Sequence, residues 1–102
     1  MAHLAVIGKE EFTLGFMLAG VRKIYIDRGS KETQKIIEEL KADPSIGIIV
    51  IQQETFDELA DYIQEELIRL VKPVVVTLSK KGEAQKLREM IIKSIGVDLW
   101  QE

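Results

Sequence analysis

The sequence has no cysteine, a single histidine, two prolines and no apolar run long enough to span a membrane. The lack of cysteine excludes disulfides and thiol chemistry, and His3 alone does not supply the several convergent ligands that a metal site needs. No signal-peptide pattern is present, so we expect a cytoplasmic protein. We also expect no bound metal and no cofactor.

The chain also lacks an excess of positive charge. Its formal net charge is -3 and its pI is about 5.3, with charged residues in small alternating groups. A nucleic-acid partner or an anionic membrane surface favours a basic patch, so we expect neither partner. The 102 residues show no break in composition, and 46% of them are hydrophobic. This is enough for one domain with one core.

What the sequence does contain is a regular alternation of apolar runs and amphipathic segments. Four runs have the β-branched, largely uncharged character of strands that are buried on both faces of a parallel sheet. These runs cover residues 4–8, 23–27, 46–51 and 73–78. Because helical patterns separate them, the predicted fold is a three-layer α/β sandwich. Its four-stranded parallel sheet is expected in the order 2-1-3-4, a shortened receiver-like or flavodoxin-like arrangement.

Local signals predict where the first two helices begin and end. Gly20 stands where a helix commonly ends in a left-handed residue, which lets the chain turn into the second strand. Ser30 is predicted to cap the second helix. Asp43 and Pro44 are predicted to end it, because the residue before a proline avoids helical geometry.

Two further helices follow the third and fourth strands. Thr55 and Glu58 have the spacing of a capping box and predict one helix that continues to about residue 71. A last helix is expected over residues 83–95, with its apolar residues on one stripe. The strands and the first three helices therefore form a head, residues 1–79, and residues 80–102 form a C-terminal helix and tail.

The carboxyl ends of parallel strands are where such sheets bind ligands, and no catalytic set occurs there in the sequence. A phosphate-accepting receiver needs a carboxylate at the end of the third strand, where this chain has Gln52 and Gln53. Gly8 and Lys9 do not form a phosphate loop, because the other glycine and the following Ser or Thr are missing. Ser30 has no neighbouring base that could activate it. We therefore expect no enzymatic activity.

The C-terminus carries apolar residues with no strand left to pair with. Ile92 lies off the apolar stripe of the last helix, and Val97, Leu99 and Trp100 follow Gly96. One interpretation is that this tail folds back onto the sheet. The other is that its large side chains anchor a partner, since aromatic residues dominate interface energetics. The residues alone leave both interpretations open.

Several blocks of the sequence, taken together, resemble a known family. The blocks are residues 4–8, 15–21, 46–51, 72–76 and 93–99. They look like the F subunit of the archaeal and bacterial A-type/V-type rotary ATPases, and the resemblance covers nearly the whole chain. Its most specific parts are Gly-Phe-x-Leu-Ala-Gly at residues 15–20 and Ile-Gly-Val-Asp-Leu at residues 95–99. Met17 departs from the family pattern, in which a basic residue is expected at that position.

The resemblance implies a non-catalytic rotor subunit in the central stalk of a proton- or sodium-translocating ATP synthase. It implies pairing with the coiled-coil D subunit inside the catalytic A/B hexamer, at the membrane periphery and without insertion. It further implies that residues 80–102 are mobile and modulate ATP hydrolysis. The expected partner-binding residues are Phe16, Met17, Leu18, Ile92, Ile95, Val97, Leu99 and Trp100. The alternatives are a receiver-like signalling or small-ligand-binding module without a phospho-acceptor, and an enzyme with an unrecognised site.

Overall fold

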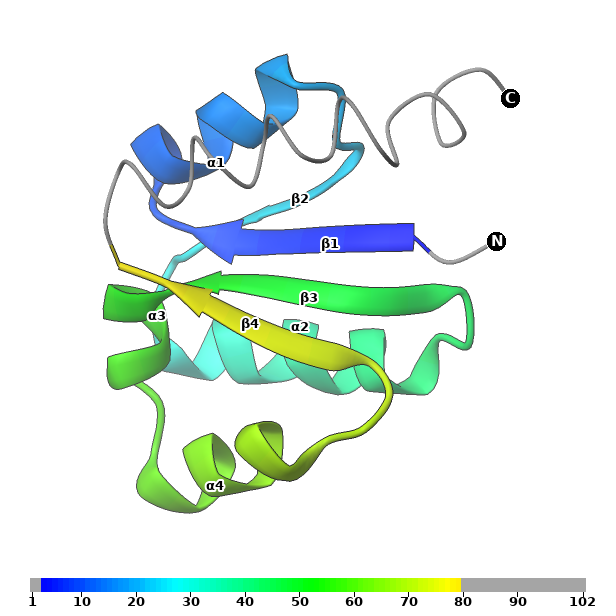
Figure 1. Ribbon diagram of the computed structural model, residues 1–102. Coiled ribbons are helices and arrows are strands. Elements are labelled where there is room, and N and C mark those ends of the chain that lie inside the picture. Colours follow the sequence, from blue (N-terminus) through cyan, green and yellow to red (C-terminus); the bar gives the residue numbers. More distant parts are fainter. Residues whose placement is uncertain (1–2, 80–102) are drawn as a thin grey trace.

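The computed structural model describes residues 3–79, which form one sheet and the helices around it (Figure 1). The strands are β1 (His3–Gly8), β2 (Lys23–Ile26), β3 (Ile46–Gln52) and β4 (Val74–Leu78). The helices are α1 (Glu10–Leu18), α2 (Ser30–Ala42), α3 (Gln53–Asp57) and α4 (Asp61–Arg69). The strands are parallel and lie in the order β2-β1-β3-β4, which confirms the predicted sheet. Each strand boundary agrees with the prediction to within one residue.

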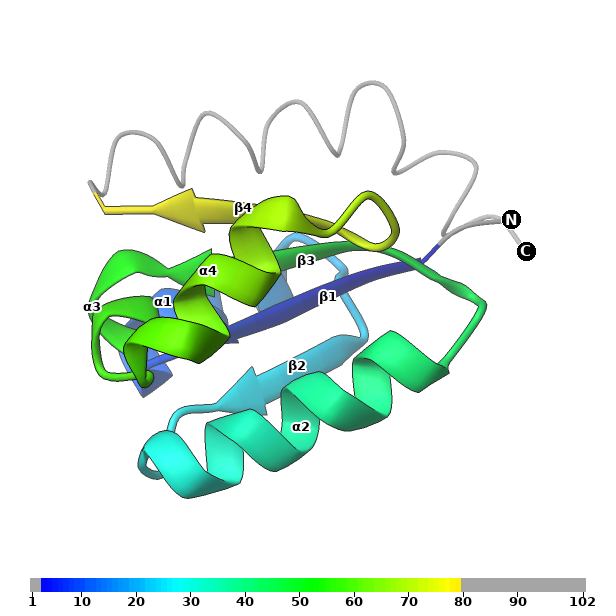
Figure 2. The same ribbon diagram turned by 90° about the horizontal axis from the view of Figure 1, so that it is seen from below.

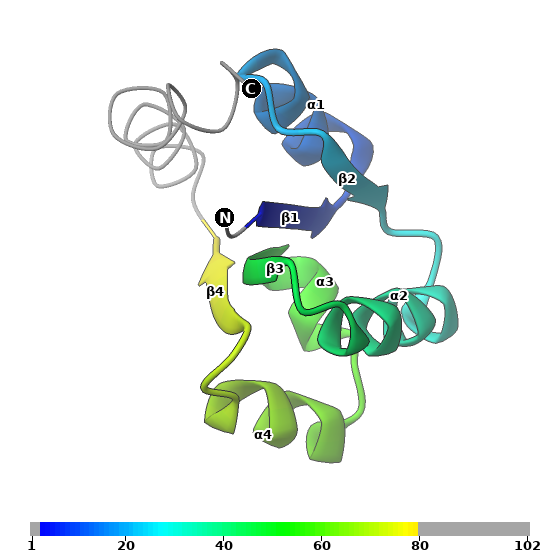
Figure 3. The same cartoon turned by 90° about the vertical axis from the view of Figure 1, so that its right-hand side faces the viewer.

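Helices cover both faces of this sheet. Helix α1 lies on one face, whereas α2 and α4 lie on the other (Figures 1 and 3). Figure 2 looks onto the second face, where α2 and α4 lie in front of the strands, and α3 lies near the carboxyl end of β3. The chain therefore crosses from β1 to β2 on one side and makes its later crossovers on the other, which is the doubly wound arrangement of a three-layer sandwich.

Alternate residues of the two central strands divide the core into two apolar clusters. Ile7 of β1 and Ile49 of β3 pack with residues of α2, α3 and α4 and are 0% exposed. Val6 and Val50, their neighbours in the sequence, pack with Phe16 of α1. Because successive side chains of a strand point to opposite faces, a strand that is apolar on both faces needs helices above and below.

The end of α1 follows the prediction made from Gly20. Gly20 has a φ of 102° and donates its N–H to the Met17 carbonyl at 3.0 Å. The next N–H, that of Val21, donates to the Phe16 carbonyl at 3.1 Å. These two bonds form a Schellman motif, and Val21 and Phe16 also pack in the same cluster. The motif turns the chain directly into β2.

The predicted single helix over residues 55–71 is wrong, because the structure has two helices there. Thr55 is buried inside α3 and donates its hydroxyl to Asp27 Oδ2 at 2.9 Å, so it is not available as a cap. Glu58 follows α3 and pairs with Lys9 instead of completing a capping box. Both side chains of the predicted box thus bind residues that are distant in the sequence, Asp27 and Lys9.

The break between α3 and α4 has its own local stabilisation. Ala60 has extended backbone, with φ −61° and ψ 149°, and its carbonyl accepts the N–H groups of Ile63 and Gln64 at 3.0 Å. The Gln64 side chain donates to the Leu59 carbonyl at 2.9 Å. In a continuous helix this carbonyl would accept a backbone N–H, so the side chain replaces the partner that is lost at the break.

The predicted cap at Ser30 is also wrong, although α2 begins at that residue. The N-cap position is Gly29, with a φ of 115° and no side-chain cap bond. Asp27 stabilises this turn from two residues upstream, because its Oδ1 accepts the Gly29 N–H at 2.9 Å. Helix α2 ends at Ala42, immediately before Asp43, as predicted.

Candidate functional site at the carboxyl edge of the sheet

The place to look for a ligand site in this fold is where the strand order reverses. The chain leaves β1 for β2 on one side and β3 for β4 on the other, so the reversal lies between β1 and β3. Lys9 follows β1, Gln52 ends β3, and Asp27 follows the neighbouring β2. The parallel strands bring all three to one edge.

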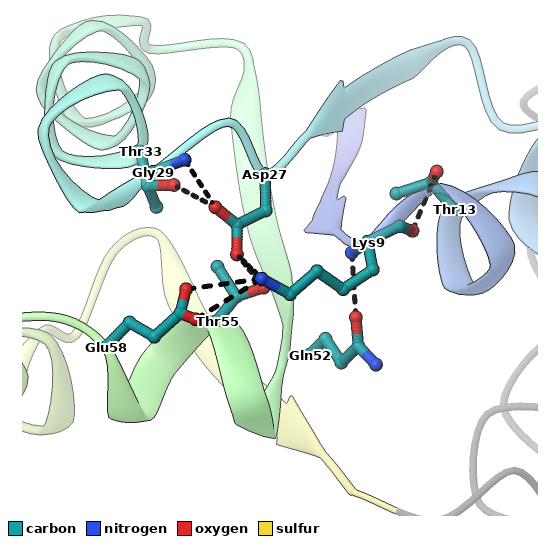
Figure 4. Close-up of polar contacts among 8 residues, drawn as sticks. All are labelled: Lys9, Thr13, Asp27, Gly29, Thr33, Gln52, Thr55 and Glu58. Carbon is teal, nitrogen blue, oxygen red and sulfur yellow. Dashed lines mark hydrogen bonds and ion pairs between the residues drawn. The ribbon is translucent and has the colours of Figure 1, made fainter.

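At this edge the Lys9 side chain reaches two carboxylates (Figure 4). Lys9 Nζ lies 2.9 Å from Asp27 Oδ2 and 3.3 Å from Glu58 Oε2. Thr55 donates its hydroxyl to the same oxygen of Asp27. We call Lys9, Asp27, Thr55 and Glu58 the carboxyl-edge cluster. It joins the start of α1 to the end of β2 and to the α3 region.

The Asp27 side chain is the buried centre of the cluster, with 0% exposure, whereas Lys9 is 42% exposed. Burial by itself raises the pKa of Asp27, since a charge is costly away from water. The Gly29 N–H, the Lys9 ammonium and the Thr55 hydroxyl together outweigh burial and hold that pKa well below its usual range. Hydrogen bonds to Asp27 and then to Glu58 raise the pKa of Lys9. Both groups are therefore charged at neutral pH.

The space between the ends of β1 and β3 is filled by side chains of the protein itself. Gln52 Oε1 accepts the Lys9 backbone N–H at 2.7 Å. A Cβ added to Gly8 would lie 2.5 Å from Phe12 Cδ2 and 3.0 Å from the Gln52 side chain. A side chain at position 8 would therefore require Phe12 and Gln52 to move, so glycine suits this position because the packing around it is close.

This arrangement favours a structural role for the edge. Within residues 3–79, every buried side-chain nitrogen and oxygen has a hydrogen-bond partner, and no group of three acidic, histidine or cysteine residues could hold a metal ion. The residues at the end of β3 are Gln52 and Gln53, and Gln53 donates to Asp57 Oδ1 at 2.8 Å. A carboxylate that could accept a phosphoryl group does not stand at the end of this strand.

The sequence analysis did not predict the ion pair of Lys9 and Asp27. Lys9 directly follows the first predicted strand and Asp27 is the last residue of the second, and the two strands are neighbours in the predicted order. That juxtaposition of opposite charges was the available signal. Glu58 gave no such signal, because it was assigned to a capping box.

Only three of the expected partner-binding residues lie in the described part of the chain. Phe16 of α1 is fully buried against the sheet, so it is not part of the exposed surface of the helix. Met17 is 51% exposed and Leu18 is 80% exposed. The other expected residues are Ile92, Ile95, Val97, Leu99 and Trp100, and they lie outside the described residues, as does the whole segment 80–102.

The exposed face of α1 is apolar over its last two turns. Leu14, which the sequence analysis did not select, is about half exposed and stands three and four residues before Met17 and Leu18. On a helix this spacing brings the three side chains together. No charged residue occurs between Glu11 and Arg22. We call Leu14, Met17 and Leu18 the α1 apolar patch.

Other exposed apolar side chains lie on α4 and just beyond it. They are Tyr62, Ile68 and Val71, and Val74 at the start of β4 is also about half exposed. Helix α4 covers the opposite face of the sheet from α1 (Figure 3). Its exposed face also carries charged residues, including Asp61 and Arg69, so it has the mixed character of an ordinary surface helix.

The fold and the site together define a class of protein. It is a small doubly wound α/β domain whose ligand edge is closed by its own ion pairs and whose first helix is apolar on its exposed face. Residues 4–95 match the family described as ATP synthase (F/14-kDa) subunit, and the chain belongs to this family.

Individual relatives agree with this assignment. The chain is 43% identical over 99 residues to the F subunit of the A-type ATP synthase of Methanococcoides burtonii, covering 97% of this chain and 99% of that relative. It is 38% identical over 101 residues to the corresponding F subunit of Archaeoglobus fulgidus, covering 99% and 100%. The crystal structure of the F subunit of the V-type ATP synthase from Archaeoglobus fulgidus matches with a TM-score of 0.67 and 32% identity, over 78% of this chain and 100% of that one. Within residues 3–79, the helices are too short or too polar to cross a bilayer.

Proposed function

We propose that this protein is a non-catalytic central-stalk subunit of an A-type/V-type ATP synthase. In this proposal its head docks on the coiled-coil D subunit of the rotor, and residues 80–102 modulate ATP hydrolysis by the A/B subunits. Membership of the ATP synthase (F/14-kDa) family supports a place in an ATP synthase complex. The observation that carries the docking proposal is the α1 apolar patch.

A helix segment that is apolar on its outer face as well as its inner face is normally covered on both. Helix α1 buries Phe16 against the sheet, yet it also leaves Leu14, Met17 and Leu18 exposed to water. Burial of one Leu or Met side chain is worth roughly 1.5–3 kcal/mol. Leu14 and Met17 are already about half buried, so docking would gain part of this value for each of them and most of it for Leu18, as in the apolar core of an interface.

A long coiled coil is a suitable partner for this surface. An amphipathic helix binds by laying its apolar residues, spaced three and four positions apart, into a groove between or beside other helices. The patch on α1 has this spacing, and Glu10 and Glu11 at the start of the helix provide a polar rim. Docking of α1 along the coiled coil of the D subunit would bury the patch.

The carboxyl-edge cluster supports the non-catalytic part of the proposal. The position at which related folds bind phosphate or nucleotide is filled by Lys9, Gln52 and their partners. The receiver-like alternative needs a carboxylate at the end of β3, where Gln52 stands. The edge thus holds elements of the head together instead of presenting a reactive group.

The docking proposal is tested by placing a charge in the patch. Leu18→Glu in the full chain should weaken binding to the purified D subunit by at least about tenfold, because a charge would be buried without a partner. Tyr62→Glu is the matched control, since Tyr62 is 67% exposed on the opposite face and should leave the affinity unchanged. Isothermal titration calorimetry measures both. Equal affinity of Leu18→Glu and wild type would refute docking through α1.

The regulatory role is tested with a chain that ends at residue 82. All four strands remain in this chain, so the head should stay folded and bind the D subunit. When it is reconstituted with the A, B and D subunits, the rate of ATP hydrolysis should differ from that with the full chain. Equal rates would refute modulation by the C-terminal segment, and loss of D-subunit binding by a folded head would place the docking surface beyond residue 82.

A further inference from the structure

Lys9, the residue before α1, makes polar contacts with several other elements of the head. Lys9 occupies the N-cap position, and its backbone N–H donates to Gln52 Oε1. Its carbonyl accepts the Thr13 N–H at 3.0 Å, within the first turn of α1. Its side chain is bound by the carboxyl-edge cluster. One residue therefore connects the beginning of α1 to β3, to the end of β2 and to the α3 region.

The remaining contacts of α1 with the sheet are mainly apolar. Phe12 and Phe16 pack against each other, with ring centroids 5.2 Å apart, and both belong to the cluster beneath the helix. The packing of these rings decides which face of α1 meets the sheet. Hydrogen-bonded ion pairs have preferred distances and angles, and they add a directional constraint at the first turn of the helix.

The cluster also joins the two faces of the head. Asp27 binds the turn before α2 through the Gly29 N–H, and Thr55 of α3 binds the same carboxylate. Both helices belong to the face opposite α1 (Figures 3 and 4). The Lys9 ammonium is the cation that connects them to the start of α1, across the carboxyl edge of the sheet.

We propose that Lys9 is a positioning residue for partner binding. Through its ion pairs with Asp27 and Glu58 it holds α1 at the angle and rotation that present the α1 apolar patch to the partner coiled coil. The inference rests on the proposed docking function of α1 and adds how the docking surface is held in place. Lys9 acts through the helix, and the patch itself makes the contact.

The test is Lys9→Met in the full chain, which keeps the length and apolar stem of the side chain and removes the ammonium. Affinity for the D subunit should fall about tenfold, as expected for the loss of coupling between two elements. The Thr13 amide should exchange its hydrogen about tenfold faster, because the first turn of α1 opens more often. Lys9→Arg keeps a cation in reach of both carboxylates and should restore affinity to within about threefold of wild type.

Two control variants separate positioning from general effects. Lys41→Met removes an ammonium that also pairs with two carboxylates, Glu38 and Glu66, but it joins α2 to α4 and not to α1. Ile37→Val loosens the core on the face opposite α1. Both should bind the D subunit as wild type does, and neither should show the faster Thr13 exchange expected of Lys9→Met.

Each possible outcome either supports or contradicts the positioning role of Lys9. Wild-type affinity of Lys9→Met, or an equal loss in Lys41→Met, would overturn the positioning role. If Lys9→Met does not fold, Glu58→Gln removes only one of the two ion pairs, and unchanged affinity and Thr13 exchange in that variant would overturn it. If the wild-type chain itself fails to bind the D subunit, the proposed function fails. In that case, faster Thr13 exchange in Lys9→Met but not in the two control variants still supports the role of Lys9 in holding α1.

Discussion

Asp27→Asn removes the negative charge at the centre of the carboxyl-edge cluster and keeps the shape of the side chain. The amide oxygen can still accept the Gly29 N–H, but the position of Oδ2, now 2.9 Å from Lys9 Nζ, loses its charge. A hydrogen bond to a charged group contributes about 1.5–3 kcal/mol. The partly exposed Lys9 regains some hydration when it is released. We therefore expect the free energy of unfolding to fall by about 2 kcal/mol at pH 7, which corresponds to roughly 8–16 °C in Tm for a domain of this size.

The pH dependence of this loss follows from the lowered pKa of Asp27. In the unfolded chain an aspartate titrates near pH 3.9, whereas in the folded protein the pKa is well below that. The ionised carboxylate therefore contributes its full stability above about pH 4 and loses it as the pH falls toward the folded pKa. Asparagine does not titrate. The difference between wild type and variant should be constant between about pH 5 and 7 and shrink by up to about 1.4 kcal/mol per pH unit below about pH 4.

Urea denaturation followed by circular dichroism, at several pH values from 7 down to 3, measures this difference. Asp57→Asn is the matched control, because Asp57 is an exposed aspartate at the same edge and accepts one hydrogen bond from Gln53. Its effect should stay within about 0.5 kcal/mol. A loss for Asp27→Asn below about 0.5 kcal/mol at pH 7, or one that does not change with pH, would refute the assigned role of the buried carboxylate.

Two further predictions concern the core and the end of α1. Ile49→Asp places a charge at a fully buried position of a central strand, in a cluster of apolar side chains, and should abolish the cooperative unfolding transition seen by circular dichroism. A melting curve like that of wild type would contradict the burial of β3 on both faces. Gly20→Val puts a β-branched side chain at a φ of 102° and should lower the free energy of unfolding, measured by urea denaturation, by roughly 1–3 kcal/mol. Unchanged stability would show that the Schellman motif does not need glycine.

The strands and their order could be predicted from the sequence. The strands depend on local apolar runs, and their order depends on the general rule for crossover connections. Runs such as residues 46–51 are apolar at every position, and only a strand covered on both faces satisfies such a run. Helices between the runs require parallel pairing, and right-handed crossovers then leave few possible orders. The end of α1 at Gly20 was predictable for a similar reason, because helices commonly end at a glycine in the left-handed conformation.

The break between α3 and α4 could not be read in this way. Thr55 and Glu58 have the spacing of a capping box, and within their own segment that prediction is reasonable. Their actual partners, Asp27 and Lys9, are 28 and 49 positions away in the sequence. A long-range ion pair or hydrogen bond competes with a local cap only after the sheet has brought the partners together.

The sequence by itself therefore determined the class of fold, the strand order and the apolar character of α1, because these depend on composition and periodicity within short segments. Tertiary structure alone decided that Phe16 faces the sheet while Leu14, Met17 and Leu18 face water, and that Lys9 is neutralised by two carboxylates. The reason is geometric. The rotation of a helix on a sheet and the meeting of strand ends depend on the packing of the whole core, and no single segment contains that information.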